Sequence, residues 1–143
     1  MIERIEIFRK ALHFHSPFRI AYEKVVEAEV VIIKLETDDG LCGLGNAAPD
    51  TEVTGETIEG VLDVLKKSLT PDFFRYPLES WYLYHQAIQR TFSGFPSAQS
   101  AVEEAMLSLW SQKFKVSLSD FFGGTQKSFP IMITIGIKEE KET

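Results

Sequence analysis

The chain has 143 residues, 44% of them hydrophobic and 25% charged, with a formal net charge of −6. These values fit one globular domain with a sizeable core. The acidic balance argues against nucleic acid as a partner, because phosphate binding needs clustered Lys and Arg side chains. No apolar run approaches the roughly 20 residues of a membrane span, so we expect no membrane partner. The single cysteine, Cys42, excludes an intrachain disulfide and fits a reducing, cytoplasmic setting.

The first third of the chain predicts three strands. Hydrophobic and charged residues alternate in the first, the second is rich in Val and Ile, and the Asp39-Gly40 that follows it is typical of a hairpin turn. Residues 13–24 break the alternation around Ser16-Pro17, which indicates a loop with several apolar side chains. A second loop is predicted over residues 49–54. The predicted strands cover residues 2–12, 28–37 and 41–48.

Helices are predicted next. Apolar residues recur at helical spacing in three stripes, and a shorter helix ends at the glycine pair Gly123-Gly124. Thr54 is the predicted N-cap of the first helix. Strands followed by helices favour an α+β fold, here a three-stranded antiparallel meander followed by a helical bundle. The helices are expected near residues 54–69, 78–92, 98–109 and 117–122.

A nearly continuous β-branched run occupies residues 129–137. It is typical of a strand buried on both faces, as in a parallel sheet. Nothing else in the chain is available to cover it. We therefore expect this segment to pair with a second copy, which would give a homodimer, or to pack irregularly onto the rest of the domain.

The segment Gly43-Leu44-Gly45-Asn46-Ala47-Ala48 matches the G-x-G-x-x-A pattern of dinucleotide-binding proteins. That pattern requires a strand that leads directly into a helix, with the pyrophosphate at the helix N-terminus. Here Pro49 and a further loop follow, and the strand is the return arm of a hairpin. We therefore interpret the glycines as positions that permit a bulge or close packing.

Other chemically active side chains give no catalytic or metal-binding pattern. His13 and His15 share a strand face but lack a third ligand, so a solvated pair is the simpler interpretation. His85 is interpreted as a hydrogen-bonded core histidine rather than a catalyst, and Cys42 as buried and inert. Glu103-Glu104 is interpreted as part of a solvated helix face.

Six stretches suggest a family. They are His15-Ser16-Pro17-Phe18, Asp39-Gly40-Leu41-Cys42-Gly43-Leu44-Gly45, Val53-Thr54-Gly55-Glu56, Ser97-Ala98 with Ala101-Val102-Glu103 and Ala105, Phe122-Gly123-Gly124, and Thr134-Ile135-Gly136-Ile137. In order and spacing they resemble the N-terminal region of the mandelate racemase/muconate lactonizing branch of the enolase superfamily. The dipeptide epimerases look like the closest subgroup.

This resemblance implies a capping domain over residues 1–124, and a linker with the first strand of a (β/α) barrel over residues 125–143. Family members bind Mg²⁺ in the barrel, which also carries the catalytic lysines. The barrel beyond Thr143 is then the expected partner, with a dipeptide-like carboxylate as substrate, and the chain alone is expected to be inactive, with no catalytic or metal-binding residue of its own. The resemblance assigns substrate contacts to Phe18, Arg19, Ile20, Tyr22, Glu23, Val53 and Thr134.

The chain departs from the family pattern at four positions. Asn46 stands where Glu is usual, Ser108 where Asp is common, and Val116 where Pro is common. Glu23 stands where some members have an Arg that pairs with a substrate carboxylate, so we expect a neutral or cationic substrate side chain instead. The alternative hypothesis is a free-standing binding or interaction domain, or a pseudogene product, that reuses the capping fold.

Overall fold

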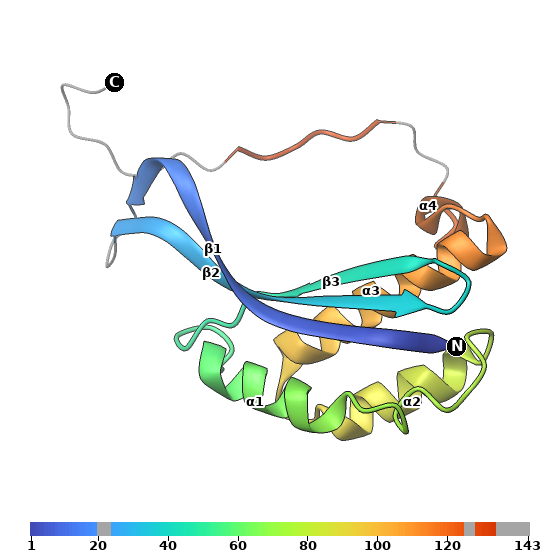
Figure 1. Ribbon diagram of the computed structural model, residues 1–143. Helices are drawn as coiled ribbons and strands as arrows, with labels where there is room; N and C mark the ends of the chain where they lie inside the picture. The colour runs from blue at the N-terminus through green and yellow to red at the C-terminus, as the bar shows by residue number, and fades with distance from the viewer. Residues whose placement is uncertain (20–23, 125–127, 134–143) are drawn as a thin grey trace.

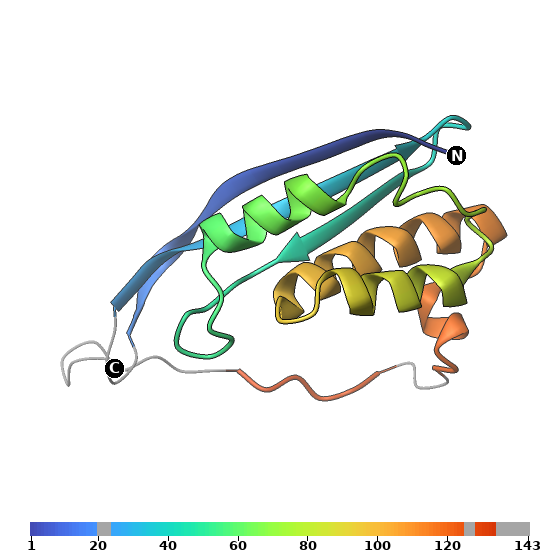
Figure 2. The same cartoon turned by 90° about the horizontal axis from the view of Figure 1, so that it is seen from below.

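The structure is a computed structural model that describes residues 1–19, 24–124 and 128–133. A three-stranded antiparallel sheet in the order β1-β2-β3 carries helices on one face (Figures 1 and 2). This arrangement confirms the predicted α+β class. The elements are β1 (Ile2–Arg19), β2 (Lys24–Thr37), β3 (Cys42–Ala47), α1 (Ile58–Ser68), α2 (Trp81–Thr91), α3 (Pro96–Phe114) and α4 (Leu118–Phe121). None of the helices described is long and apolar enough to cross a membrane.

The first hairpin is longer than predicted. Residues 13–19 belong to β1 rather than to a loop, and the last described pair of the hairpin is Arg19 opposite Lys24. The register shifts between His13 and Phe18, so the broken alternation around Ser16-Pro17 marks an irregularity within the ladder. Proline is tolerated here because β1 is an edge strand. The hairpin therefore projects well beyond β3 (Figure 1).

The core lies between the sheet and the helices, and α3 lies directly against β3. The inner face of β2 contributes Val31, Ile33 and Leu35, all fully buried. A Cβ atom on Gly45 would lie 2.8 Å from the carbonyl carbon of Ala101 and would overlap its oxygen, and a Cβ on Gly43 would overlap Ala105. The glycines thus serve close packing, as predicted, and no helix follows β3 directly.

The first helix begins later than predicted. Its N-cap is Thr57, whose Oγ1 accepts a hydrogen bond from the Gly60 N–H at 3.1 Å. The predicted N-cap, Thr54, instead donates its hydroxyl to the carbonyl of Asp50 at 2.9 Å. Both threonines have the chemistry of a cap, and Thr54 is already used by the turn that precedes the helix.

The chain leaves the domain after α4. Residues 128–133 form no strand and run apart from the sheet and helices (Figures 1 and 2). Their apolar side chains are exposed, from 71% at Phe129 to 96% at Met132. The strand predicted over 129–137 is thus not formed in its described part, and its remainder, with Thr134, lies outside the described residues. Association through this segment remains a prediction.

Candidate functional site

Two concave regions lie at opposite ends of the sheet. The first, which we call the loop end, lies between the projecting β1–β2 hairpin and the loop that joins β3 to α1. The second, the turn end, lies beside the β2–β3 turn and the N-terminus of the chain. Of the predicted substrate contacts that the structure describes, none lines either cavity, although Val53 directly follows Glu52 of the loop-end groove.

The loop end is a broad groove of about 990 Å³ lined by β2, by the loop after β3 and by the start of α1. Among the residues that the structure describes, no Lys or Arg lines this groove. A groove with this charge attracts cations and repels anions. Its acidic lining residues are Glu27, Glu29, Asp50, Glu52, Glu56 and Glu59.

Part of this negative charge is compensated within the domain. The guanidinium of Arg9, on β1, binds Glu29 at 2.7 Å and Glu59 at 3.1 Å. The hydrogen bond to Glu29, more than any other contact, raises the pKa of Arg9. His13 Nδ1 lies 2.9 Å from a carboxylate oxygen of Glu27. These contacts hold the hairpin and the start of α1 on either side of the groove.

Three acidic residues of the groove have no cationic partner within the described part of the chain, namely Asp50, Glu52 and Glu56. Glu56 is bound to Ser97 instead. The carboxylate of Asp50 has a local role, because one oxygen accepts the N–H groups of Glu52 at 2.8 Å and of Val53 at 3.2 Å. Glu52 is exposed. Its carboxylate forms no ion pair or hydrogen bond within the described residues, and Glu52 directly precedes Val53 in the sequence.

The Asp50 turn presents Val53 to solvent. The carbonyl of Asp50 accepts the N–H groups of Thr54 at 2.7 Å and of Gly55 at 3.1 Å. Gly55 has a φ of +73°, a conformation that favours glycine. Val53 is 77% exposed at the tip of this closed turn. An exposed apolar side chain on a well-bonded turn is suited to contact a bound molecule.

The predicted contact residues lie on the first hairpin and on the loop that joins β3 to α1. These two segments lie at the same end of the sheet in both views (Figures 1 and 2). Arg19 is exposed, and β1 includes Phe18, whose backbone pairs with Val25 of the groove. Ile20, Tyr22, Glu23 and Thr134 lie outside the described residues. The sequence analysis did not identify the acidic groove, because its residues come from separate segments.

Three interpretations of individual polar residues need correction. His85 is 45% exposed rather than in the core, and its Nδ1 lies 2.9 Å from Glu103 on α3. Glu104 accepts the N–H of Asn46 at 2.9 Å and so covers part of the β3 edge, which means that this acidic pair is not simply solvated. Cys42 is only partly buried. Within the described residues no three His, Cys, Asp or Glu side chains gather as a metal site would require.

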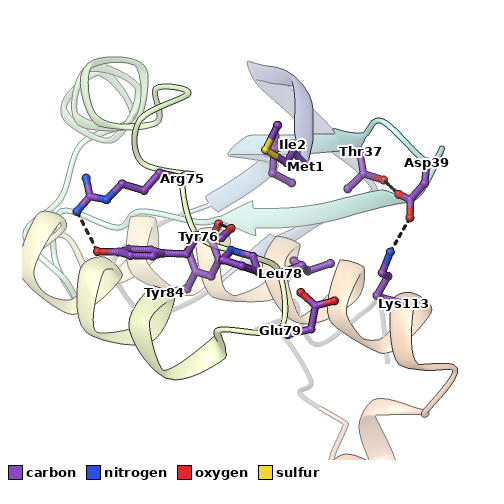
Figure 3. A pocket seen from close by; sticks show the side chains of 11 residues that line it. Met1, Ile2, Thr37, Asp39, Arg75, Tyr76, Leu78, Glu79, Tyr84 and Lys113 are labelled. Carbon is purple, nitrogen blue, oxygen red and sulfur yellow. Dashed lines mark hydrogen bonds and ion pairs between the residues drawn. The ribbon is translucent and has the colours of Figure 1, made fainter.

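The turn end is a smaller cavity of about 280 Å³ in which Asp39 and Lys113 are paired with each other, whereas Glu79 forms no ion pair within the described residues (Figure 3). Asp39 accepts hydrogen bonds from Lys113 at 2.8 Å and from Thr37 at 2.6 Å. These two bonds, the one from Lys113 first, lower the pKa of Asp39 to about 2. Tyr84 donates its hydroxyl to the carbonyl of Tyr76 at 2.5 Å, and burial raises the pKa of Tyr84 to about 12. These internal bonds indicate a structural role for this cavity.

A family model described as "Mandelate racemase / muconate lactonizing enzyme, N-terminal domain" matches residues 2–123. An L-Lys-D/L-Arg epimerase of Desulforapulum autotrophicum is 32% identical over 99% of this chain and 40% of its own length. An N-succinyl-L-Arg/Lys racemase of Bacillus cereus is 28% identical over 96% of this chain and 38% of its own.

Solved structures agree with this result. The dipeptide epimerase of Methylococcus capsulatus, complexed with Mg and the dipeptide L-Arg-D-Lys, superposes with a TM-score of 0.85 at 28% identity. That comparison covers 99% of this chain and 40% of the epimerase. The chain therefore spans about 40% of the length of the relatives that it matches.

Proposed function

This chain belongs to the mandelate racemase/muconate lactonizing enzyme family, whose N-terminal domain it represents. We propose that it caps the active site of an epimerase or racemase and helps to select the substrate. The two segments that form the loop end, the β1–β2 hairpin and the loop after β3, would close over the mouth of the barrel. A barrel is the remaining part that the family resemblance implies.

We further propose that the substrate carries a cationic side chain. The observation that carries this proposal is the groove at the loop end, whose described lining residues include six acids and no Lys or Arg. Glu52, which has no cationic partner within the described residues, would attract a Lys or Arg side chain and repel an acidic one. Relatives named for Lys and Arg substrates agree with this choice.

The residues of this chain would bind and orient the substrate and exclude water from it. Val53 would contact the apolar part of the side chain, and Glu52 its charge. The described residues do not fit a magnesium site, so the metal and the groups that move the α-proton would belong to the rest of the enzyme. Bound Mg²⁺ stabilises the negative charge that develops when a proton leaves the carbon beside a carboxylate.

A domain exchange tests this proposal. Residues 2–123 would replace the corresponding region of the Desulforapulum autotrophicum epimerase, and kcat/KM would be measured on dipeptides that end in Lys, Leu or Glu. We expect the hybrid enzyme to favour the Lys dipeptide over the Glu dipeptide by about tenfold or more, a difference worth one charge interaction in a partly shielded site.

The unchanged epimerase and the hybrid with Glu79→Lys serve as controls, because Glu79 is an exposed acid at the turn end. A folded hybrid that prefers the Glu dipeptide would refute the proposed substrate class. A folded hybrid without activity on any dipeptide, beside an active parent, would refute the capping role and favour a free-standing binding domain. The 143-residue chain alone is expected to catalyse no α-proton exchange in D₂O.

A further inference from the structure

Glu56 is an acidic side chain of the groove lining that is 4% exposed. Both carboxylate oxygens accept the N–H of Ser97 at 3.1 Å, and one also accepts the Ser97 hydroxyl at 2.6 Å. Ser97 lies in the first turn of α3, 41 residues further along the chain. A buried carboxylate with three such bonds fixes its own backbone tightly to the element that it binds.

The N-terminus of α3 lacks a cap of its own. Its N-cap residue is Phe95, which offers no side-chain acceptor, and Pro96 follows at the first helical position. Glu56 supplies the missing acceptor and also places a negative charge where the helix dipole favours one. The contact therefore stabilises α3 and the loop together.

The loop that presents Val53 is held at both ends by the same part of the domain. It leaves β3 after Ala47, which is 1% exposed, and β3 lies directly against α3 through Gly43 and Gly45. It returns to α3 at Glu56. Between these points the turn is closed by the hydrogen bonds to Asp50. The loop is thus attached at two places to one rigid unit, which β3 and α3 form together.

We propose that Glu56 is a positioning residue, which fixes the Val53 turn to α3 so that this side of the groove acts as a rigid wall rather than as a hinged lid. The consequence for substrate selection rests on the proposed function. Glu56 itself would not touch the substrate, because Ser97 occupies its carboxylate. The position of Val53, next to the groove residue Glu52, would then depend on the hydrogen bonds between Glu56 and Ser97.

Distance measurements between two nitroxide labels test this proposal on the 143-residue chain, without any need for activity. One label is attached through Val53→Cys and the other on α2 through Arg90→Cys, with Cys42→Ser to prevent labelling there. The parent should give one narrow distance distribution. Glu56→Ala should broaden it about twofold or shift its maximum, because the turn loses one of its two attachments.

Graded variants separate positioning from general stability. Glu56→Gln keeps one acceptor oxygen, and Ser97→Ala removes only the hydroxyl donor, so both should broaden the distribution less than Glu56→Ala does. Ser117→Ala is the matched control: it removes the side-chain cap of α4, away from the loop, and should leave the distribution unchanged.

If Glu56→Ala does not fold, as judged by circular dichroism, Glu56→Gln and Ser97→Ala carry the test. An unchanged distribution in every folded Glu56 and Ser97 variant would overturn the positioning role, even if the hybrid enzyme behaves as expected. Conversely, broadening by Glu56→Ala or by the graded variants supports positioning even if the hybrid enzyme is inactive, which would count against the proposed function alone.

Discussion

The two ends of the sheet differ in how far their charged side chains are paired. At the turn end, the acidic residue Asp39 is bound to Lys113 and Thr37. At the loop end, acidic residues line a groove that has no Lys or Arg among its described lining residues, and Arg9 compensates only two of the acids. Charges that are paired within a domain hold its parts together, whereas unpaired charges around a concave surface favour binding of an opposite charge. The difference is consistent with a structural role for the turn end and supports the recognition proposed for the loop end.

The substitution with the largest expected effect disrupts the packing of β3 against α3, which supports both ends of the sheet. Gly45→Ala places a Cβ atom against the backbone carbonyl of Ala101, and neither backbone can move away without separating β3 from α3. We expect a loss of about 3 kcal/mol or more in the free energy of unfolding, measured by urea denaturation, which would leave a domain of this size close to unfolding.

Gly60→Ala provides the matched control for an added methyl group. Its Cβ would lie 3.1 Å from Thr57 Oγ1 and 3.6 Å from a ring carbon of Phe95, both side-chain atoms that can shift. Alanine also has a higher helix propensity than glycine, so the stability should change by less than about 1 kcal/mol. Similar losses in both variants would contradict the close contact between β3 and α3.

The fold was predictable wherever a local pattern decides it. Alternation identified β1, and helical stripes identified α1, α2 and α3, because each pattern reports burial of one face. The length of the hairpin was not predictable. Ser16-Pro17 breaks the alternation, and only pairing with β2, across the chain, keeps residues 13–19 extended. The N-cap was misassigned because Thr54 and Thr57 differ only in what surrounds them.

The site was predictable only through the family resemblance. The resemblance assigned substrate contacts to the first hairpin and to the loop after β3, and these two segments lie at one end of the sheet. The contacts themselves stay a prediction. The acidic groove was not expected, because its residues come from three segments that only the folded chain brings together. The bond from Glu56 to Ser97 spans 41 residues, and no local pattern signals it.

The next largest effect tests the unpaired charge at the loop end. Glu52→Lys in the hybrid enzyme would place a cation beside the proposed position of a cationic side chain. We expect kcat/KM on the Lys dipeptide to fall by about tenfold while the value for the Leu dipeptide changes little, because only the charged side chain senses the reversal. Glu79→Lys, at the turn end, should leave both values unchanged. Equal losses on both dipeptides would indicate damage to the fold rather than altered recognition.

A smaller effect tests the paired charge at the turn end. The pKa of Asp39 is lowered to about 2 from its ordinary 3.8. A carboxyl group whose pKa is lowered by folding adds stability above its ordinary pKa, and that contribution is lost as the pH falls from about 4 to about 2. We expect urea midpoints measured over this range to decline less steeply in Lys113→Ala than in the parent.

A double-mutant comparison isolates this pair from the other acidic groups that titrate over the same range. Asp39→Asn removes the titrating group, so adding Lys113→Ala to it should cause little further change in the pH dependence. If Lys113→Ala alters the slope equally with and without Asp39→Asn, then the stabilising partner of Lys113 is a different group.

The prediction with the smallest expected effect tests whether the two ends of the sheet depend on the residues after α4. The described residues after α4 add exposed apolar surface and no core, since Ile131 and Ile133 are 79% and 85% exposed. Deletion of residues 126–143 should therefore shift the melting temperature by no more than about 2 °C, which corresponds to less than 1 kcal/mol for a chain of this size. The deletion should also lower any self-association seen in sedimentation, because exposed apolar segments promote association. Unfolding of the shortened chain would mean that the segment completes the core, and unchanged association would mean that it does not join two copies. If neither result is obtained, residues 1–124 hold both ends of the sheet by their own contacts, and the loop end keeps its unpaired acids without help from the segment after α4.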